Sequence, residues 1–465
     1  MQHFVGRNNE LNDLNAKYQS PNFEMIVIYG RRRVGKTALI SEFIQNKPAI
    51  YYQGIESTGD MNLKNLSEKI NDLKNDDFNT ASYADFEKAF TEVQNIANHL
   101  EQKLVFVIDE YPFLARSEHS VSSILQYVID HVYKKYNNVM LILCGSSMSF
   151  MERQVLGYKS PLYGRKTGQL KLEPFDLFES ETMLPSVNKS DLLGYYGITG
   201  GIPQYLAYIN PEISLRDNIR QMFFSPVAPL RDEPNVLMQE EMRNPATYNA
   251  ILKTIANGSN HYNDIVQATD ITSSSLTPYL KNLIDIGVIQ KKQPLFNKNN
   301  RKAYYYIVDG LFRFWFKFVD GETDLIVRGQ VDRLLDYIMS ELPRFLGPVF
   351  EQASGDWLWR QNDLPIGIRT IGQWWGPNPA KKREEEIDIV APDFTNNQAI
   401  IGECKWRAKD KIKPEMIDTL VERSFLVPKI KQSYLYFFAK EATPGFKAYA
   451  QKNNVTVIEY QHFFE

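Results

Sequence analysis

One short segment combines glycines, a lysine and a threonine at a spacing suited to binding phosphate. Residues 30–37 read GRRRVGKT and match the pattern G-x-x-x-x-G-K-[ST] completely. Glycines let the backbone wrap tightly, so that N–H groups and a helix N-terminus face an anionic phosphate. Lys36 would then reach the β- and γ-phosphates of a nucleotide, and the Thr37 hydroxyl would bind Mg²⁺. The segment therefore predicts a nucleotide site.

Other residues of this loop are expected to contribute to the same site. Three consecutive arginines make its entrance positive and could attract an anionic nucleotide. Each of them is more simply interpreted as peripheral than as catalytic. The nucleotide-binding residues expected in this segment are Gly30, Arg31, Arg32, Arg33, Val34, Gly35, Lys36, Thr37 and Ala38.

Two acidic residues end an apolar run about 70 residues further along the chain, where residues 104–110 read LVFVIDE. Asp109 is placed to hold a hydrated Mg²⁺, and Glu110 can orient and deprotonate an attacking water. Alone, an Asp-Glu pair after a strand indicates a solvated strand end. The complete phosphate loop upstream reverses that balance and favours a hydrolytic role.

Two further residues are weaker candidates for the same site. Ser146 follows the apolar run VMLILC and could sense the γ-phosphate, although a plain strand-to-loop turn explains it equally well. Arg165, in PLYGRKTG, could be an arginine that stabilises the transition state of hydrolysis. In a homo-oligomer it could act at the site of a neighbouring subunit. The alternative for Arg165 is an ordinary surface residue.

A second group of chemically capable residues lies towards the C-terminus. Asp388 lies in EEIDIVAP, Glu403 and Lys405 lie in AIIGECKW, and Glu351 precedes them on an expected helix. An antiparallel hairpin could bring Asp388 and Glu403 together, and Glu403 and Lys405 share one face of a strand. Carboxylates there would bind Mg²⁺, and Lys405 could position or activate a water. The alternative is a charged strand pair without catalysis.

The elements that would position the nucleotide site alternate between strands and helices. Apolar runs separated by amphipathic stretches, over about residues 1–180, predict a parallel sheet with helices on both faces. The expected strands are 25–29, 49–53, 104–109, 139–144 and 168–172. The expected helices include 36–46, 61–75, 83–99 and 120–136. A mainly helical region follows, broken at Gly200, Gly201 and Pro203, and could form a lid.

Residues 245–320 show a different pattern, with three short helices followed by a hairpin. This resembles a winged helix-turn-helix, which could bind double-stranded DNA through its third helix and wing. Nine Lys and Arg residues against five Asp give the segment a net charge of +4. The alternative is a packing module between domains. The basic residues of the third helix and wing are Lys281, Lys291, Lys292, Lys298, Arg301 and Lys302.

The composition of the 465-residue chain suits a multidomain globular protein. It contains 53 basic and 56 acidic residues, a net charge of −3, which excludes a chain-wide basic protein. Cys144 and Cys404 lie in apolar runs, which fits a reducing compartment without a disulfide. We see no signal peptide and no apolar run long enough to span a membrane. A cytoplasmic protein is therefore expected.

Several N-terminal segments together resemble the archaeal and bacterial ATPase family, which is related to AAA+ and STAND NTPases and to origin-recognition ATPases. These segments are FVGRNNEL, YGRRRVGKTALI, DEYPFL, SPLYGRKTG and TGGIPQYL. The resemblance covers about residues 1–240 and implies ATP, with its adenine near Phe4, Val5 and Gly6. It also implies a lid in which GGIP, with Pro203, stands where classical AAA+ proteins carry a sensor arginine. GGIPQYL contains no arginine, so the usual coupling of hydrolysis to lid motion is not implied.

The C-terminal part resembles the PD-(D/E)xK nuclease family, of the DUF234 type. Asp388 and the run Glu403-Cys404-Lys405 match its core, and Glu351 matches its helical acidic residue. The expected αβββαβ order agrees with this restriction-endonuclease-like fold. The resemblance implies metal ligation by Glu351, Asp388 and Glu403. A nuclease-like scaffold without catalysis remains the alternative.

These observations predict an α/β multidomain protein that binds and hydrolyses ATP with Mg²⁺. Its nucleotide state would control a DNA-binding, nuclease-like C-terminal half. A STAND-type assembly switch that binds a partner without cutting is the alternative, and a DNA-processing motor is a third. The expected domains are a P-loop ATPase core (1–185), a helical lid and linker (186–244), a winged helix-turn-helix (245–320), a helical linker (321–344) and a nuclease-like domain (345–465).

Overall fold

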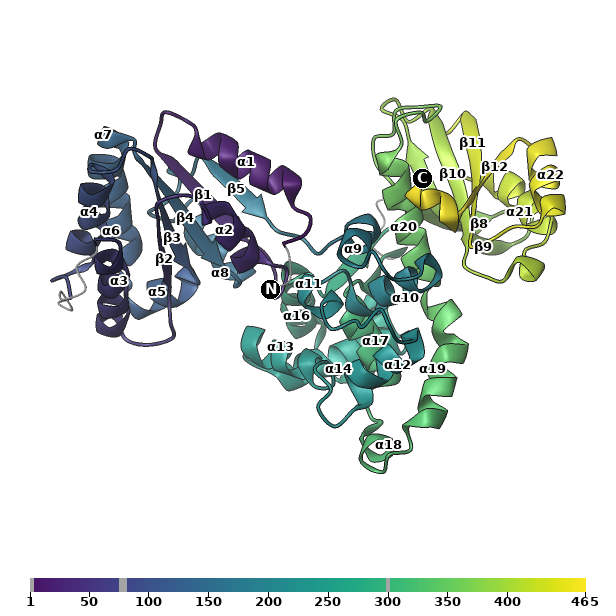
Figure 1. The fold of residues 1–465 in the computed structure, drawn as a ribbon. Helices are drawn as coiled ribbons and strands as arrows, with labels where there is room; N and C mark the ends of the chain where they lie inside the picture. Colours follow the sequence, from purple (N-terminus) through teal and green to yellow (C-terminus); the bar gives the residue numbers. More distant parts are fainter. Residues whose placement is uncertain (1–3, 75–81, 298–301) are drawn as a thin grey trace. The chain divides into compact units, whose positions relative to one another are not determined.

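The computed structural model describes residues 4–74, 82–297 and 302–465. The chain divides into two compact units, shown in Figure 1. The first comprises Met1–Pro174 with Ile202–Gln204, and the second comprises Phe175–Gly201 with Tyr205–Glu465. Among the described residues, no helix has both the length and the apolar character needed to cross a bilayer.

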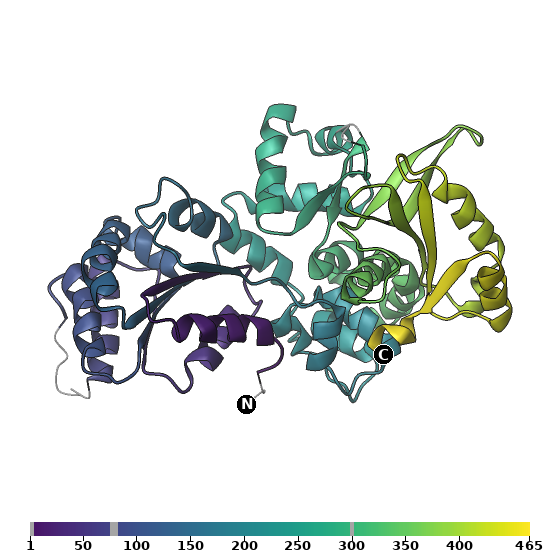
Figure 2. The same ribbon diagram turned by 90° about the horizontal axis from the view of Figure 1, so that it is seen from above.

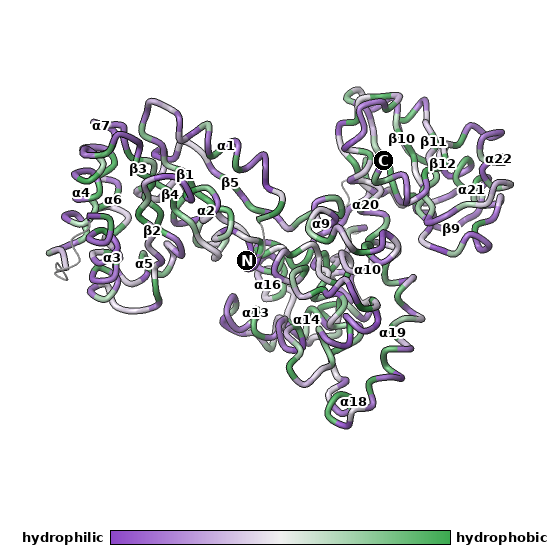
Figure 3. Tube along the Cα trace, in the orientation of Figure 1, coloured by the Kyte–Doolittle hydropathy of each residue, from purple (hydrophilic) through white to green (hydrophobic). Residues whose placement is uncertain are grey.

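A five-stranded parallel sheet forms the centre of the first unit, as predicted. Its strands lie in the order β2-β3-β4-β1-β5. Every residue of β1, β3 and β4 is buried, which fits strands covered by helices on both faces. Figure 3 shows the apolar character of these strands. The strands are β1 (Glu24–Tyr29), β2 (Ala49–Gln53), β3 (Leu104–Asp109), β4 (Val139–Gly145) and β5 (Gly168–Lys171).

The helices of this unit lie on the two sides of the sheet (Figure 1). Apolar side chains of α3, α4 and α6 pack on one face in a single core that includes Phe90 and Phe106. Helices α1 and α2 lie on the other side. The helices are α1 (Asn8–Tyr18), α2 (Lys36–Ile44), α3 (Gly59–Leu73), α4 (Phe86–Ala97), α5 (Tyr111–Ser117), α6 (Val121–Val128), α7 (Lys134–Tyr136) and α8 (Met148–Phe150), with π-helical turns at Ile129–Tyr133 and Met151–Val155.

The second unit opens with short helices, of which the first precedes the predicted helical region 186–244 and the others lie within it. An Asp176 capping box starts its first helix, because Asp176 and Glu179 each accept a hydrogen bond from the other's backbone N–H. The helices are α9 (Leu177–Met183), α10 (Lys189–Thr199), α11 (Pro203–Leu206, which begins within the first unit), α12 (Leu215–Ile219) and α13 (Glu233–Glu241), with a π-helical segment at Arg220–Phe224.

Three helices and an antiparallel hairpin follow, as the sequence pattern predicts. Leu276, Leu280 and Leu283 of the third helix are all buried, which confirms that they share the inward face. Helical segments then lead into the C-terminal region. These elements are α14 (Pro245–Ala256), α15 (Tyr262–Thr269), α16 (Ser273–Asp285), β6 (Ile289–Lys292), β7 (Tyr304–Ile307), α17 (Gly310–Phe318), α18 (Thr323–Val327) and α19 (Val331–Phe345).

The C-terminal region contains a second, mixed sheet in the order β12-β11-β10-β9-β8. Figure 2 shows this region in green to yellow. Strands β8, β9 and β10 pair antiparallel, whereas β10, β11 and β12 pair parallel. The expected αβββαβ order is present, and a further helix precedes the last strand. The elements are α20 (Gly347–Arg360), β8 (Gly372–Asn378), β9 (Arg383–Pro392), β10 (Gln398–Lys405), α21 (Glu415–Ser424), β11 (Gln432–Ala439), α22 (Pro444–Lys452) and β12 (Val455–Glu459).

Candidate functional site

The phosphate-loop segment forms a tight turn between β1 and α2. Gly35 adopts φ 92° and Arg33 adopts φ 71°, both in the left-handed region. A Cβ atom on Gly30 would lie 2.3 Å from the Leu172 carbonyl oxygen, so only glycine fits there. Val34 is buried, whereas Thr37 and Ala38 are exposed at the start of α2. This geometry confirms the predicted strand–loop–helix context.

The Lys36 side chain folds back over its own loop. Its ammonium group donates hydrogen bonds to the carbonyl oxygens of Gly30 at 2.9 Å and Arg31 at 2.8 Å. Burial lowers the pKa of Lys36 from its ordinary value, and the nearby acidic side chains of Asp109 and Glu110 oppose that shift. Lys36 therefore holds the loop in shape and is positioned to exchange these carbonyls for phosphate oxygens.

Asp109, at the end of β3, lies beside Thr37 as predicted. Its Oδ2 atom accepts hydrogen bonds from the Thr37 hydroxyl at 2.9 Å and the Tyr51 hydroxyl at 2.5 Å. Its Oδ1 atom accepts the Glu110 backbone N–H at 2.8 Å. Thr37 and Asp109 thus offer adjacent oxygen donors, the ligand type that Mg²⁺ prefers, and they fit that ion. Mg²⁺ bound there would neutralise phosphate charge.

Tyr51 is a member of this site that the sequence did not single out. It lies on β2, the strand next to β3, and Tyr51 pairs with Val107 in the register of the sheet. Burial and the neighbouring Asp109 raise the pKa of Tyr51 far above its ordinary value, so its hydroxyl remains a proton donor. Only the strand order brings this side chain to Asp109, and no spacing in the sequence indicates it.

Glu110 and Ser146 lie together at the ends of neighbouring strands. The Ser146 hydroxyl donates to Glu110 Oε2 at 3.0 Å. Glu110 itself adopts φ 47°, a left-handed conformation, at the N-cap position of α5, and its side chain makes no capping hydrogen bond there. Such a held carboxylate can orient a water for attack on a phosphate and accept its proton. The hydrogen bond to Glu110 supports the prediction that Ser146 belongs to the nucleotide site.

The remaining predicted nucleotide residues come from three different segments. Phe4, Val5 and Gly6 precede α1, and the buried Arg7 after them donates a hydrogen bond to the Glu173 carbonyl oxygen at 2.5 Å. Residues 202–204, with Pro203, belong to the same compact unit as the phosphate loop. The nucleotide contacts expected of these residues remain predictions.

Arg165 is engaged elsewhere in the first unit. Its guanidinium group contacts Asp130 at 2.8 Å and donates to the Tyr163 carbonyl oxygen at 2.9 Å. These contacts hold Arg165 against the π-helical turn after α6. Within one chain the structure does not bring Arg165 to the phosphate loop, and its role in a neighbouring subunit remains a prediction.

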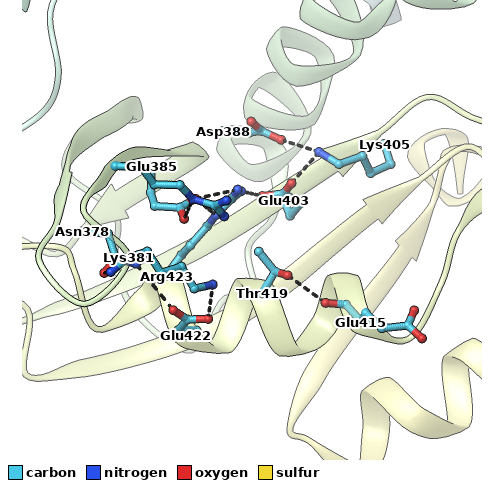
Figure 4. A network of polar contacts seen from close by, with 11 residues as sticks. Asn378, Lys381, Glu385, Asp388, Glu403, Lys405, Glu415, Thr419, Glu422 and Arg423 are labelled. Atoms are coloured by element: carbon cyan, nitrogen blue, oxygen red, sulfur yellow. Dashed lines mark hydrogen bonds and ion pairs between the residues drawn. The ribbon is translucent and has the colours of Figure 1, made fainter.

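Three of the four predicted residues of the C-terminal site, Asp388, Glu403 and Lys405, share one ion network, drawn in Figure 4. The Lys405 ammonium group lies 2.5 Å from Glu403 Oε1 and 3.4 Å from Asp388 Oδ2. Arg423 of α21 lies 3.4 Å from the other Glu403 oxygen and 2.8 Å from Glu385. The β9–β10 hairpin thus brings Asp388 and Glu403 together, as predicted. Arg423 and Glu385 are members that the sequence analysis missed.

Glu351 does not join Asp388 and Glu403 in one ligand set. Its carboxylate accepts a hydrogen bond from Gln373 at 2.9 Å, and Lys405 occupies the position between the other two acids. Over the residues that the structure describes, no group of three or more His, Cys, Asp or Glu side chains is arranged to hold a metal ion. As they lie, these residues do not fit the metal centre that the resemblance implied.

Negative charge is nevertheless concentrated around Asp388. Burial and the charge of Asp388 raise the pKa of Glu351 to about 8 and also raise the pKa of Glu403. Burial opposes ionisation of Lys405, but Asp388 and Glu403 outweigh it and raise the pKa of that lysine. Lys405 therefore stays charged and neutralises part of the cluster.

The β6–β7 hairpin docks on β8 beside this cluster. The Leu295 backbone N–H donates to the Gln373 carbonyl oxygen at 2.9 Å, and the Leu295 side chain joins the core of the C-terminal region. The rings of Tyr304 and Trp375 lie 5.3 Å apart, and the Trp375 indole donates to the Lys302 carbonyl oxygen. The hairpin and the mixed sheet therefore form a continuous packed surface.

Two of the predicted wing lysines take part in this docking. Lys292 bonds to Gln373 at 3.1 Å, and the same amide bonds to Glu351. Lys302 pairs with Glu384 at 2.7 Å. Lys298 and Arg301 lie outside the described residues. Lys292 and Lys302 thus have protein partners, because the hairpin packs against an acidic sheet. On α16, by contrast, Lys281 is exposed.

Two family models match the chain. A model described as an ATPase domain predominantly from Archaea matches residues 4–209. The DUF234 model, of archaeal and bacterial proteins of unknown function, matches residues 315–417. These matches agree with the two resemblances predicted from the motifs, although the DUF234 match does not itself show a nuclease.

Individual proteins are similar over much of the chain. An uncharacterised protein of Methanocaldococcus jannaschii is 35% identical over 439 residues, covering 91% of this chain and 92% of that protein. The solved structure of the Walker-type ATPase of Pyrococcus abyssi aligns with a TM-score of 0.54 and 22% identity, covering 68% of this chain and 96% of that one. With the phosphate loop, Asp109 and Glu110 in place, the chain belongs to the archaeal ATPase family and is a P-loop enzyme that hydrolyses ATP.

Proposed function

We propose that this ATPase uses Mg²⁺ and that its nucleotide state controls double-stranded DNA binding by its C-terminal half. The observation that carries the DNA proposal is the outer face of α16. That face exposes hydroxyl side chains and one lysine, and the helix carries no acidic residue before Asp285. Hydroxyls, lysines and helix N-termini are the groups that contact phosphates of duplex DNA. The exposed hydroxyl residues and lysine of α16 are Ser273, Ser274, Ser275, Thr277 and Lys281, and Pro278 and Ile284 are exposed on the same helix.

Binding of a fluorescent DNA duplex over a range of salt concentrations tests this proposal. Lys281→Glu should weaken binding about tenfold and lower the slope of log affinity against log salt by about one. Lys452→Glu, the same charge change at an exposed position on α22, is the matched control and should leave binding nearly unchanged. Absence of wild-type binding at low salt, or equal loss in both variants, would contradict the proposal.

Control by the nucleotide requires a comparison of liganded states. The same titration is repeated without nucleotide, with ADP and with ATP, in the wild type and in Lys36→Ala. A nucleotide-dependent change of DNA affinity in the wild type that disappears in Lys36→Ala supports control. DNA affinity that is identical in every state would exclude it.

The ion network at Asp388, Glu403 and Lys405 does not fit the metal centre that the resemblance implied, so the predicted nuclease chemistry is tested separately from DNA binding. A cleavage assay with Mg²⁺ or Mn²⁺ compares the wild type with Asp388→Ala. Cleavage that is lost in the variant supports catalysis there. Equal cleavage by both proteins, or none in either, removes the catalytic assignment and leaves the DNA-binding proposal standing.

A second candidate function is a STAND-type switch that binds a partner without cutting nucleic acid. The ion network of Figure 4 favours it, because Lys405 and Arg423 neutralise Glu403 within the protein itself. Light scattering with and without ATP distinguishes the two functions. A switch changes its assembly state with ATP and leaves DNA intact, whereas an unchanged molecular mass with ATP argues against the switch.

A further inference from the structure

We infer that Tyr51 is a positioning residue of the ATPase, which orients the Asp109 carboxylate for the Mg²⁺-bound nucleotide. The Tyr51 hydroxyl lies 2.5 Å from Asp109 Oδ2, the same oxygen that accepts the Thr37 hydroxyl at 2.9 Å. Asp109 therefore receives donors from two different segments on one oxygen. A short bond from a neutral hydroxyl to a carboxylate is among the stronger hydrogen bonds in proteins.

The geometry explains why a second donor matters. The Asp109 Oδ1 atom accepts the Glu110 backbone N–H at 2.8 Å, so both carboxylate oxygens are held and the group cannot rotate freely. Thr37 stands at the start of α2, directly after Lys36, whose bonds to the Gly30 and Arg31 carbonyls would be displaced by phosphates. Tyr51 belongs to a β-strand paired with β3, so its bond to Asp109 does not depend on the loop. Tyr51 thus holds Asp109 from a β-strand that is separate from the phosphate loop.

The next residue of the same strand provides a matched control. Tyr52 is buried and donates its hydroxyl to Asn62 Oδ1 at 2.5 Å, on the face of the sheet covered by α3. Successive side chains of a strand point to opposite faces, so Tyr52 has no access to Asp109. Tyr51→Phe and Tyr52→Phe therefore each remove one hydroxyl from β2, and only the first touches the nucleotide site.

The test measures nucleotide binding separately from hydrolysis. Affinity for a fluorescent ATP analogue is determined with Mg²⁺ and with EDTA in the full-length wild type and in both variants. Tyr51→Phe should weaken binding with Mg²⁺ by about tenfold and leave binding in EDTA unchanged. It should also raise the Mg²⁺ concentration needed for half-maximal hydrolysis. Tyr52→Phe should change neither the affinity for the ATP analogue nor the Mg²⁺ dependence of hydrolysis. The melting temperature of the Tyr52→Phe protein can fall, because a buried hydrogen bond is lost.

Two outcomes would overturn the inference. One is a Tyr51→Phe protein with the Mg²⁺ dependence of the wild type. The other is an equal loss of affinity with and without Mg²⁺, which would indicate a structural role only. A double-mutant cycle with Asp109→Asn gives an independent readout, because Tyr51→Phe should have no further effect on Mg²⁺-dependent binding once the charge of Asp109 is gone.

Discussion

The Ser146 hydroxyl donates a hydrogen bond to the Glu110 carboxylate at 3.0 Å, which joins the ends of strands β3 and β4 across the hydrolytic site. We expect Ser146→Ala to lower kcat about tenfold, since Glu110 would lose the group that orients it towards the attacking water. Nucleotide affinity should stay unchanged. Phosphate release and binding of a fluorescent ATP analogue measure the two quantities. Ser147→Ala is the control, because its hydroxyl does not bond to Glu110, and an equal effect in both variants would refute the assignment.

Lys36→Ala should abolish ATP hydrolysis, because the ammonium group that reaches the phosphates is removed. Glu110→Gln should also stop hydrolysis but should retain nucleotide binding, since its role is to orient and deprotonate water. Steady-state phosphate release and equilibrium binding of ATP are measured for the Lys36→Ala and Glu110→Gln proteins. Full activity in Lys36→Ala would rule out this site as the origin of hydrolysis.

Lys405→Met should lower the free energy of unfolding by about 3 kcal/mol, because Asp388 and Glu403 would lose the cation that they share. Urea unfolding measures the change. Lys409→Met is the control, because the Lys409 ammonium group pairs with Glu441 at 3.8 Å at an exposed position, and this variant should change stability by less than about 0.5 kcal/mol. Equal free energies of unfolding for the two variants would show that the Lys405 contacts drawn in Figure 4 do not stabilise the fold.

Trp375→Ala should loosen the docked β6–β7 hairpin, since it removes the ring contact with Tyr304 and the hydrogen bond to Lys302. Amide hydrogen exchange in β6 and β7 should become roughly tenfold faster. Trp359→Ala removes an indole that is 52% exposed on α20 and serves as the control. Unchanged exchange in β6 and β7 of Trp375→Ala would mean that the docking does not depend on this contact.

Asp356 on α20 should make stability depend on pH. Burial, with a contribution from Asp176, raises the pKa of Asp356 to about 6, above the value of about 3.9 in an unfolded chain. The folded state therefore binds this proton more tightly. The resulting stabilisation is complete below about pH 3.9 and is lost as the pH rises through about 6.

Asp356→Asn should accordingly raise the free energy of unfolding near neutral pH by at most about 3 kcal/mol, with little change near pH 4. Urea unfolding at several pH values measures this difference. Asp363→Asn, at an exposed position beyond the end of α20, should change stability by less than about 0.5 kcal/mol at every pH. A destabilised Asp356→Asn protein at neutral pH would contradict the assignment.

Much of the fold and the centre of the nucleotide site could be predicted from the sequence alone. The phosphate loop is a contiguous segment, and its glycines, Lys36 and Thr37 determine a local backbone path between a strand and a helix. The fully buried strands of the first sheet appear as unbroken apolar runs, because helices cover both faces. Asp109 and Glu110 could be assigned because they end an apolar run downstream of a complete phosphate loop.

The side-chain partners were decided only by the tertiary structure. Tyr51 reaches Asp109 because β2 and β3 are neighbours, and Arg165 pairs with Asp130 because a π-helical turn lies beside it. Lys405 lies between Asp388 and Glu403, and Lys292 faces the mixed sheet, because separate modules pack together. Local sequence determines backbone conformation and burial pattern, but the partner of a charged side chain depends on strand order and on packing between distant segments.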